Sequence, residues 1–289
     1  MSFFAAFLPF FSLDIKNIYL YSMTAYREYF PTKAFRIAEM RLSSLLGRER
    51  DRLDALAADL GRDCAVGPDN LVEQLPLIRE FTREYHRLFS EYLDAVLPQQ
   101  PRPIQCRPAC GNCCHHYPMS VEPFELLTLY DDLRGRNDLL DIMEACQVRS
   151  SLFSRMFESR RTEAEKGKNV DGESQTSQMD LDDYAEDKAL HDYFAAWNPC
   201  PFSDKAGDCT VYPLRPVSCR MYFSETDPKF CTPEHLQTPE NDSYIVYLPD
   251  SIEDAVYGIS EHYSLLDLPE SYFGGLLAVN RFEGLIGGN

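Results

Sequence analysis

Apolar residues recur at steps of three to four positions along much of the chain, the pattern of amphipathic helices. The first such stretch spans residues 33–60 and the clearest spans 70–97, where Asp69 can cap the start and Pro98 stops the end. Pro76 lies inside the second stretch, so this helix either kinks or begins there. Further helical patterns occur at 122–133, where Pro123 opens the first turn, and at 137–160, 180–197, 251–264 and 270–286.

Two segments break this periodicity. Residues 98–118 read PQQPRPIQCRPACGNCCHHYP, and residues 198–241 hold seven prolines, too many helix breakers for a long helix. The polar segment 161–179 predicts a disordered or mobile insertion, and 243–249 predicts one short strand. The predicted fold is therefore mostly α, with helical segments around an irregular, cysteine-rich, metal-organised centre and few or no strands.

The same pattern predicts the division of the chain. We expect a helical N-terminal region, a cysteine-cluster metal-binding region and a helical C-terminal region, at residues 23–103, 104–241 and 242–289. Residues 1–22 are apolar at their start and resemble a signal-peptide core, but no basic residue precedes Lys16. The alternative is that translation begins at Met23 and that 1–22 are an over-extended start.

Charge narrows the classes of partner. The chain has 28 Lys+Arg against 46 Asp+Glu, a formal net charge of -18, which argues against nucleic acid and against an anionic membrane surface. No run of about 18 apolar residues is present, so a spanning helix is excluded. A basic protein partner could bind the acidic stretch 180–192, although a solvated helix face explains the same charges. We expect a cytoplasmic chain whose cysteines stay reduced, and clustered thiols there indicate metal.

Eight of the ten cysteines fall into two groups. The first has the spacing C-x3-C-x2-C-C and the second C-x8-C-x9-C-x11-C, and the candidate metal ligands are Cys106, Cys110, Cys113, Cys114, Cys200, Cys209, Cys219 and Cys231. The other two, Cys64 and Cys146, have no close thiol neighbour and are predicted to be buried as small hydrophobic side chains.

Thiolates this close together repel one another, and a bound cation removes the unfavourable electrostatic energy of that repulsion. Pro108 and Gly111 supply the bend that lets the first four converge. Zinc held by four thiolates and a cysteine-ligated iron–sulfur cluster both fit, and the adjacent pair Cys113-Cys114 slightly favours iron–sulfur. Arg107, Arg215 and Arg220 either offset the negative charge or lie on the surface.

Other interpretations of these residues stay open. In an exported chain the cysteines would form disulfides, and one of the eight, Cys231, could be simply buried. His115 and His116 could each replace a thiolate as a metal ligand or be ordinary loop histidines. The same two interpretations apply to His235, which lies near Cys231.

The ordered motifs resemble the YkgJ-type cysteine-cluster family, described as zinc- or iron-chelating. The resemblance covers roughly residues 104–232 and rests on Cys106-x3-Cys110-x2-Cys113-Cys114, Cys200-Pro201-Phe202, Cys209-Thr210-Val211-Tyr212 and Arg215-Pro216-x2-Cys219-Arg220. It implies a cytoplasmic bacterial metal-binding protein of largely unassigned activity, with these seven cysteines as ligands and Cys231 as the outermost candidate. In that picture Pro216 fixes a turn that presents Cys219, and Arg215 or Arg220 donates to cluster sulfur; the alternative is a plain turn with solvated arginines.

Rival functions belong to other classes, and whether the chain is an enzyme stays open. Cys106, Cys110 and Cys113 match the triad of radical S-adenosylmethionine enzymes, but that fold needs alternating strands and helices, and a fourth cysteine follows at once. Flagellin lysine N-methylase shares a similar cluster, but no glycine-rich methyl-donor loop is present here. A metal-stapled interaction module, or a metal store or delivery protein, is the non-catalytic alternative.

Overall fold

The computed structural model describes residues 32–100, 102–107, 109–171, 178–236, 238–246 and 248–286. The fold is mostly α, as predicted. Its helices are α2 Lys33–Asp59, α3 Leu71–Val96, α4 Pro123–Leu133, α5 Leu139–Asp171, α6 Gln178–Ala195, α7 Asp250–Ser260, α8 Tyr272–Val279 and α9 Glu283–Ile286. The expectations for residues 1–22 and Met23 lie outside the described residues. No helix in the described part of the chain combines the length and apolar character needed to cross a membrane.

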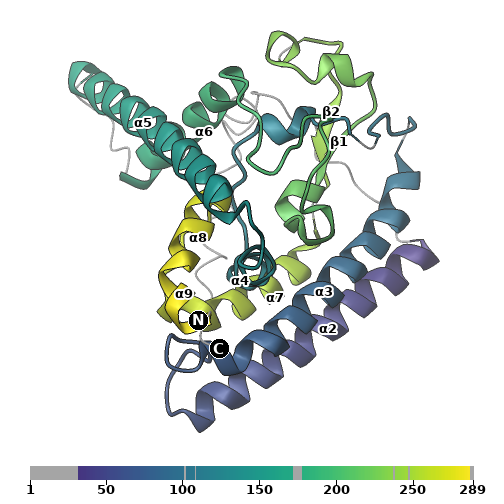
Figure 1. Ribbon diagram of the computed structural model, residues 1–289. Helices are drawn as coiled ribbons and strands as arrows, with labels where there is room; N and C mark the ends of the chain where they lie inside the picture. The colour runs from purple at the N-terminus through teal and green to yellow at the C-terminus, as the bar shows by residue number, and fades with distance from the viewer. Residues whose placement is uncertain are drawn as a thin grey trace.

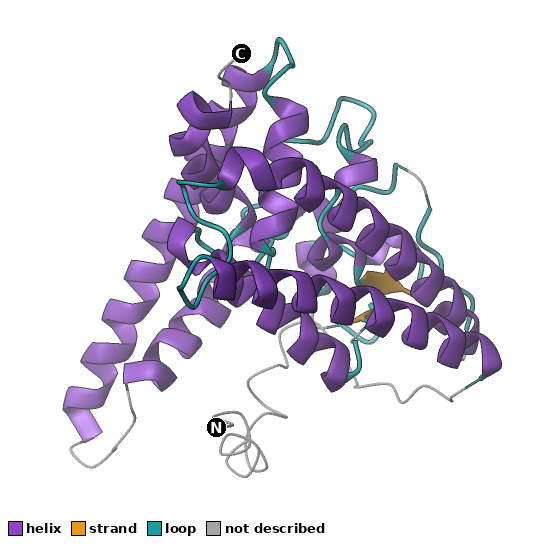
Figure 2. Ribbon diagram, turned by 90° about the horizontal axis from the view of Figure 1, so that it is seen from below, coloured by secondary structure: helices purple, strands orange, loops and turns teal. Residues whose placement is uncertain are grey.

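The long helices α2 and α3 run side by side along one edge of the molecule (Figures 1 and 2). Thr32 caps α2 by accepting a hydrogen bond from the backbone N–H of Phe35 at 3.1 Å. The predicted cap of α3 was wrong by one residue: the N-cap position belongs to Asn70, and Asp69 instead pairs with Arg62 at 2.9 Å. The helix begins at Leu71 and continues through Pro76, whose missing N–H removes one intrahelical hydrogen bond.

Helix α4 lies at the centre of the fold and is buried on nearly every side. It packs against α3 and α8, and the edge of the Phe124 ring meets Phe81 and Tyr85 of α3 at centroid distances of 5.0 and 5.5 Å. The aromatic positions of the α3 pattern are therefore core residues, as predicted. Glu122 caps α4 and forms a capping box with Glu125.

Helices α5 and α6 form a hairpin that projects from the body (Figures 1 and 2). The predicted insertion at 161–179 differs here, because 161–171 and 178–179 are helical; residues 172–177 lie outside the described residues. Two causes explain the extension: Arg, Glu, Ala and Lys are strong helix formers, and Arg160 of α5 pairs with Asp192 of α6 at 2.6 Å. The polar composition thus belongs to helix rather than to an irregular insertion.

The two cysteine-bearing segments are irregular, as predicted, with short 3-10 turns between bends. The strand predicted at 243–249 is confined to β2 Ser243–Ile245, and it pairs antiparallel with β1 Tyr222–Ser224. This partner strand was not predicted, because three residues among prolines and cysteines carry no readable alternation. The two C-terminal helices predicted at 251–264 and 270–286 are each interrupted by 3-10 turns, at Glu261–Leu266 and Asn280–Phe282.

Candidate metal centre

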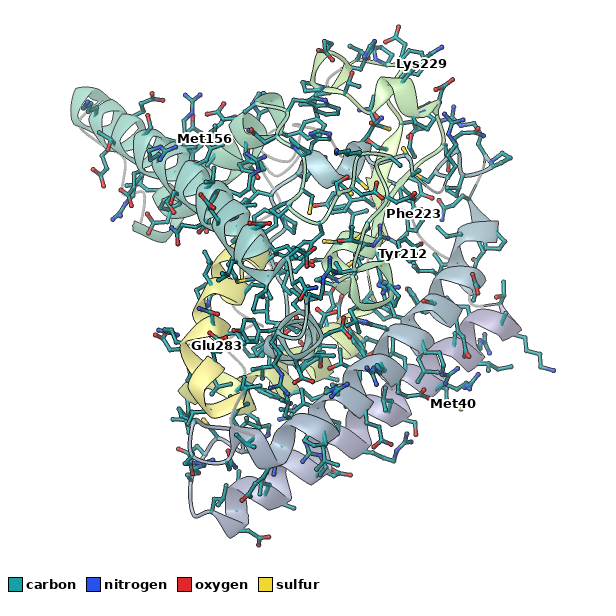
Figure 3. All side chains as sticks on the ribbon, in the orientation of Figure 1. Met40, Met156, Tyr212, Phe223, Lys229 and Glu283 are labelled. Carbon is teal, nitrogen blue, oxygen red and sulfur yellow. The ribbon has the colours of Figure 1, made fainter. Side chains whose placement is uncertain are left out.

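The two cysteine-bearing segments lie against each other although helices α4 to α6 separate them in the sequence. A Cβ atom on Gly111 would come within 3.4 Å of the Gly207 carbonyl oxygen, and both glycines have positive φ, 68° and 88°. The Asn112 side chain donates to the Pro228 carbonyl at 2.5 Å. The bend expected at Gly111 is therefore confirmed, whereas Pro108 lies outside the described residues. In Figure 3 sulfur atoms gather near the labelled Phe223 and Tyr212.

One group of thiols surrounds the adjacent pair Cys113 and Cys114, whose side chains hydrogen-bond to each other. That bond lowers the pKa of Cys113 and raises the pKa of Cys114, and the thiols of Cys200 and Cys219 raise the latter further. Burial raises the pKa of Cys200 to about 12 and also raises the pKa of Cys219. Cys209 belongs here too, because its thiol interacts electrostatically with those of Cys113 and Cys200.

A second group gathers around Ser224 of β1. The Cys106 sulfur accepts a hydrogen bond from the backbone N–H of Ser224 at 3.3 Å, and the Cys231 thiol hydrogen-bonds to the Ser224 side chain. Burial raises the pKa of Cys106 to about 11, and the thiols of Cys113, Cys110 and Cys231 add to that rise. Cys231 is thus in electrostatic contact with the first cysteine loop, and its pKa is raised mainly by burial.

All eight candidate cysteines therefore share one region, and all ten cysteines are free thiols. Within the described ranges, no three histidine, cysteine or acidic side chains lie close enough together to hold a metal ion. The donor chemistry nevertheless fits a thiophilic metal, because partly buried thiols that raise one another's pKa gain most from a cation. Of the other two cysteines, Cys146 is fully buried as predicted, whereas Cys64 is only partly buried and its sulfur lies 3.0 Å from the Ser264 hydroxyl.

The Arg215-Pro216 turn presents Cys219, as the resemblance implied. Pro216 precedes a 3-10 turn over Val217–Arg220, and its carbonyl accepts from the Cys219 N–H at 3.0 Å. Arg220 spans the turn by donating to three backbone carbonyls, those of Arg215, Tyr212 and Pro213, at 2.6, 3.1 and 3.0 Å. The hydrogen bond expected from Arg220 to sulfur is thus replaced by bonds to the backbone, because this guanidinium lies against three carbonyl groups.

Arg215 acts on the thiols through its charge. Its guanidinium lies 5.0 Å from the centroid of the Tyr212 ring, so it is held by a cation–π contact rather than by sulfur. The hydrogen bond from Cys114 has the largest effect on the pKa of Cys113 and lowers it, and the positive charge of Arg215 lowers it further. The same charge opposes the increase in pKa that burial causes at Cys209 and Cys219. The turn therefore supplies a cation beside a set of groups that must become anions to bind metal.

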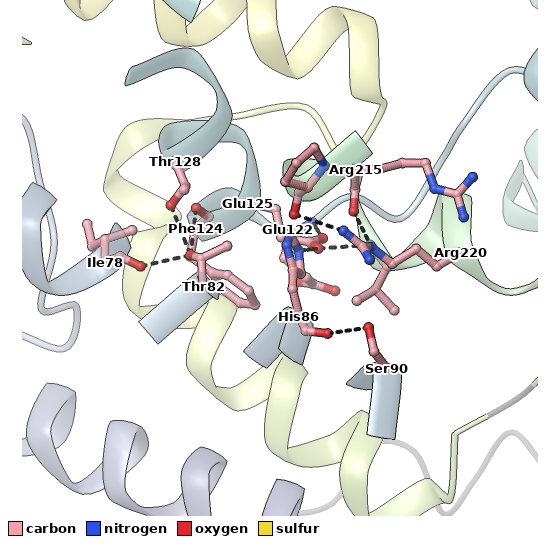
Figure 4. A network of polar contacts seen from close by, with 12 residues as sticks. Ile78, Thr82, His86, Ser90, Glu122, Phe124, Glu125, Thr128, Arg215 and Arg220 are labelled. Carbon is pink, nitrogen blue, oxygen red and sulfur yellow. Dashed lines mark hydrogen bonds and ion pairs between the residues drawn. The ribbon is translucent and has the colours of Figure 1, made fainter. Parts of the chain in front are cut away.

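A buried hydrogen-bonded contact fixes this turn to the helical body (Figure 4). Nε2 of His86 in α3 lies 2.6 Å from Oε1 of Glu125 in α4, and the same oxygen accepts from the Val217 N–H at 2.8 Å. Sequence reasoning missed both residues. The sequence did contain an indication of their role, because each is a polar residue on the apolar face of its helix.

The three candidate histidines each contact an aromatic ring. His115 stacks on Trp197 at 3.8 Å, His116 stacks on Phe194 at 4.0 Å, and His235 meets the edge of Phe230 at 5.1 Å between ring centroids. Burial lowers the pKa of His116 to about 4 and also lowers that of His115. These contacts give the histidines a packing role, and their part as ligands stays a prediction.

Comparison with known proteins gives one match. Residues 105–241 match the family model CxxCxxCC, whose description reads “Putative zinc- or iron-chelating domain”. The match spans both cysteine-bearing segments and the α4 to α6 helices between them. Neither the curated proteins nor the solved structures contain a significant match.

Proposed function

Residues 105–241 match the CxxCxxCC family model of zinc- or iron-chelating domains, and from this premise we propose that the cysteines of both segments together hold metal. The proposed ligands are Cys106, Cys110, Cys113, Cys114, Cys200, Cys209, Cys219 and Cys231. The observation that carries the proposal is the contact between the two segments, in which thiols of both interact electrostatically with Cys113. A bound metal ion would supply the positive charge that stabilises these thiolates.

The residues around the thiols support this chemistry. Because burial raises the pKa values of Cys106 and Cys200 to about 11 and about 12, these thiols stay protonated at neutral pH until a cation displaces the protons. Arg215 reduces the repulsion between the resulting thiolates. No three donors lie close enough together to hold a metal ion within the described residues, so the proposal expects the thiols to draw together when metal binds, and the binding energy then stabilises the fold.

Cys113 interacts with thiols of both groups, and we assign it to the outer one, which gives two sets of four thiols and an expected capacity of two metal sites. The outer set, around Ser224, comprises Cys106, Cys110, Cys113 and Cys231. The inner set, beside the Arg215-Pro216 turn, comprises Cys114, Cys200, Cys209 and Cys219. Four thiolates are the usual complement of a structural zinc ion and of a [4Fe–4S] cluster.

Iron–sulfur is the slightly favoured occupant over zinc. The hydrogen-bonded neighbours Cys113 and Cys114 suit a cluster with several metal vertices better than one tetrahedral ion. A cytoplasmic location accords with ten free cysteines. A radical S-adenosylmethionine enzyme would need alternating strands and helices, whereas the sheet of the described residues has two strands.

Metal analysis of the full chain, purified without oxygen, tests the proposal. We expect metal in the wild type, with iron, sulfide and a brown colour for clusters, or colourless zinc-loaded protein for a zinc site. Cys219→Ser should lose metal, whereas Cys64→Ser, a matched cysteine outside the set, should keep it. Wild-type protein that takes up neither zinc nor an iron–sulfur cluster on reconstitution would overturn the proposal.

A further inference from the structure

A hollow of about 490 Å³ lies behind the second cysteine segment, between α3 and the residues Thr210 to Arg220. Small-molecule sites commonly have volumes of roughly 300–1,000 Å³. Arg83, His86 and Arg87 of α3 line one side, Thr210 and Arg220 line the other, and Asp132 also contributes. The hollow is thus large enough for a small organic molecule, and its wall includes residues adjacent to Cys209 and Cys219.

The arginines of this hollow are incompletely paired with acids. Arg87 is held by ion pairs to Glu84 and Glu91, so its charge is already matched. Arg83 has no hydrogen bond or ion pair to any residue in the described ranges. Positive charge that is not neutralised by a neighbouring acid is unusual on a chain whose net charge is -18.

Arg220 is the second arginine whose charge is not matched. Its guanidinium donates to three neutral backbone carbonyls and makes no ion pair with an acidic side chain among the described residues. One carboxylate, Asp132, also lines the hollow and forms no ion pair with either arginine among the described residues. An anion bound here would stabilise the Arg220 charge directly.

His86 gives the hollow a buried polar group. The residue is 4% exposed, and its Nε2 is occupied by Glu125 at 2.6 Å. Its Nδ1 has no hydrogen-bond partner among the described residues, which is costly for a buried ring nitrogen. Nδ1 is itself buried, so His86 forms part of the wall of the hollow, beside the network that Figure 4 draws around His86 and Arg220.

We infer that this hollow binds a small organic anion through its carboxylate or phosphate group. Arg83 and Arg220 provide the charge, because guanidinium groups bind both oxyanions through paired N–H donors. Val211 and Leu214 offer apolar surface to the remainder of the ligand. The ligand would lie beside the cysteine segment without contributing a metal ligand, so the inference stands apart from the metal proposal.

Binding to the full chain as purified tests the inference, with benzoate as the carboxylate probe and phenyl phosphate as the phosphate probe. Calorimetric titration at constant ionic strength should give saturable binding of at least one probe, and which one binds identifies the anionic group. Arg83→Gln should weaken that binding about tenfold, the equivalent of one charge-assisted hydrogen bond. Arg155→Gln, the same charge change on exposed α5, should leave it unchanged. Absence of saturable binding by both probes, or equal weakening by both variants, overturns the inference.

Discussion

Nε2 of His86 and Oε1 of Glu125 lie 2.6 Å apart, and the side chains are 5% and 0% exposed. The same carboxylate oxygen accepts from the Val217 N–H at 2.8 Å, two residues before Cys219. One buried contact therefore joins α3, α4 and the turn that carries a proposed metal ligand. Such a contact specifies where the turn lies as well as contributing to stability.

We expect Glu125→Ala to lower the free energy of unfolding by about 3 kcal/mol, because it leaves His86 and the Val217 N–H buried without partners. Urea denaturation of purified protein measures this. Glu91→Ala, which removes a partly exposed carboxylate paired with Arg41 and Arg87, should cost no more than about 1 kcal/mol. Equal losses in the two variants would show that the buried contact has no special role.

The two sets of thiols predict separable metal losses. Cys231→Ser removes a thiol of the outer set and Cys219→Ser one of the inner set, so each should lose about half of the wild-type metal. Metal content per chain, measured by mass spectrometry under anaerobic conditions, checks this, with Cys64→Ser as the control. If either variant loses all metal and yet remains folded, the eight thiols act as one site.

The fold was predictable where the sequence repeats a period. Helices at 33–60 and 70–97 were placed almost to the residue, because each buries one continuous apolar face. The extension of α5 to Asp171 was missed, because a two-helix hairpin can be stabilised by ion pairs that leave no apolar pattern. The first turn of α4 begins at Pro123, as predicted, whereas the N-cap of α3 is Asn70 rather than Asp69.

The proximity of the two cysteine segments was also predictable, because both segments carry thiols and a shared metal would bring those thiols together. The contacts of the arginines were not, since Arg220 bonds carbonyls that come together only in the folded turn. The role of Glu125 was hidden for the same reason, because its partners His86 and Val217 lie 39 and 92 positions away. Long-range polar contacts of this kind have no local period to read.

Packing between the two loops predicts a strong effect at Gly207. Its φ is 88°, and an added Cβ would lie 3.2 Å from the Ala109 carbonyl oxygen, so Gly207→Ala strains the loop and pushes the segments apart. We expect a loss of about 1–3 kcal/mol in stability and weaker metal binding. Gly47→Ala in α2, where nothing lies within 4 Å, should instead stabilise by about 0.5–1 kcal/mol. Thermal unfolding together with competition against a chromogenic chelator measures both quantities.

Glu122 predicts a pH dependence of stability. Burial raises the pKa of this carboxyl from 4.5 to about 7, although the Ser260 hydroxyl donates to it and opposes the rise. A folded-state pKa above the unfolded value means that the protonated form favours folding, so this contribution is complete below about pH 4.5 and is lost as the pH rises to about 7.

Glu122→Gln keeps a neutral hydrogen-bonding group at this cap and should remove that part of the pH dependence. The free energy of unfolding of the variant, measured in urea between pH 4.5 and pH 7, should therefore fall less steeply than that of the wild type. Glu84→Gln is the matched control, because Arg87 lowers the pKa of Glu84 and the linkage there has the opposite sign. Parallel curves for the wild type and Glu122→Gln would mean that Glu122 ionises in the folded protein as it does in the unfolded chain.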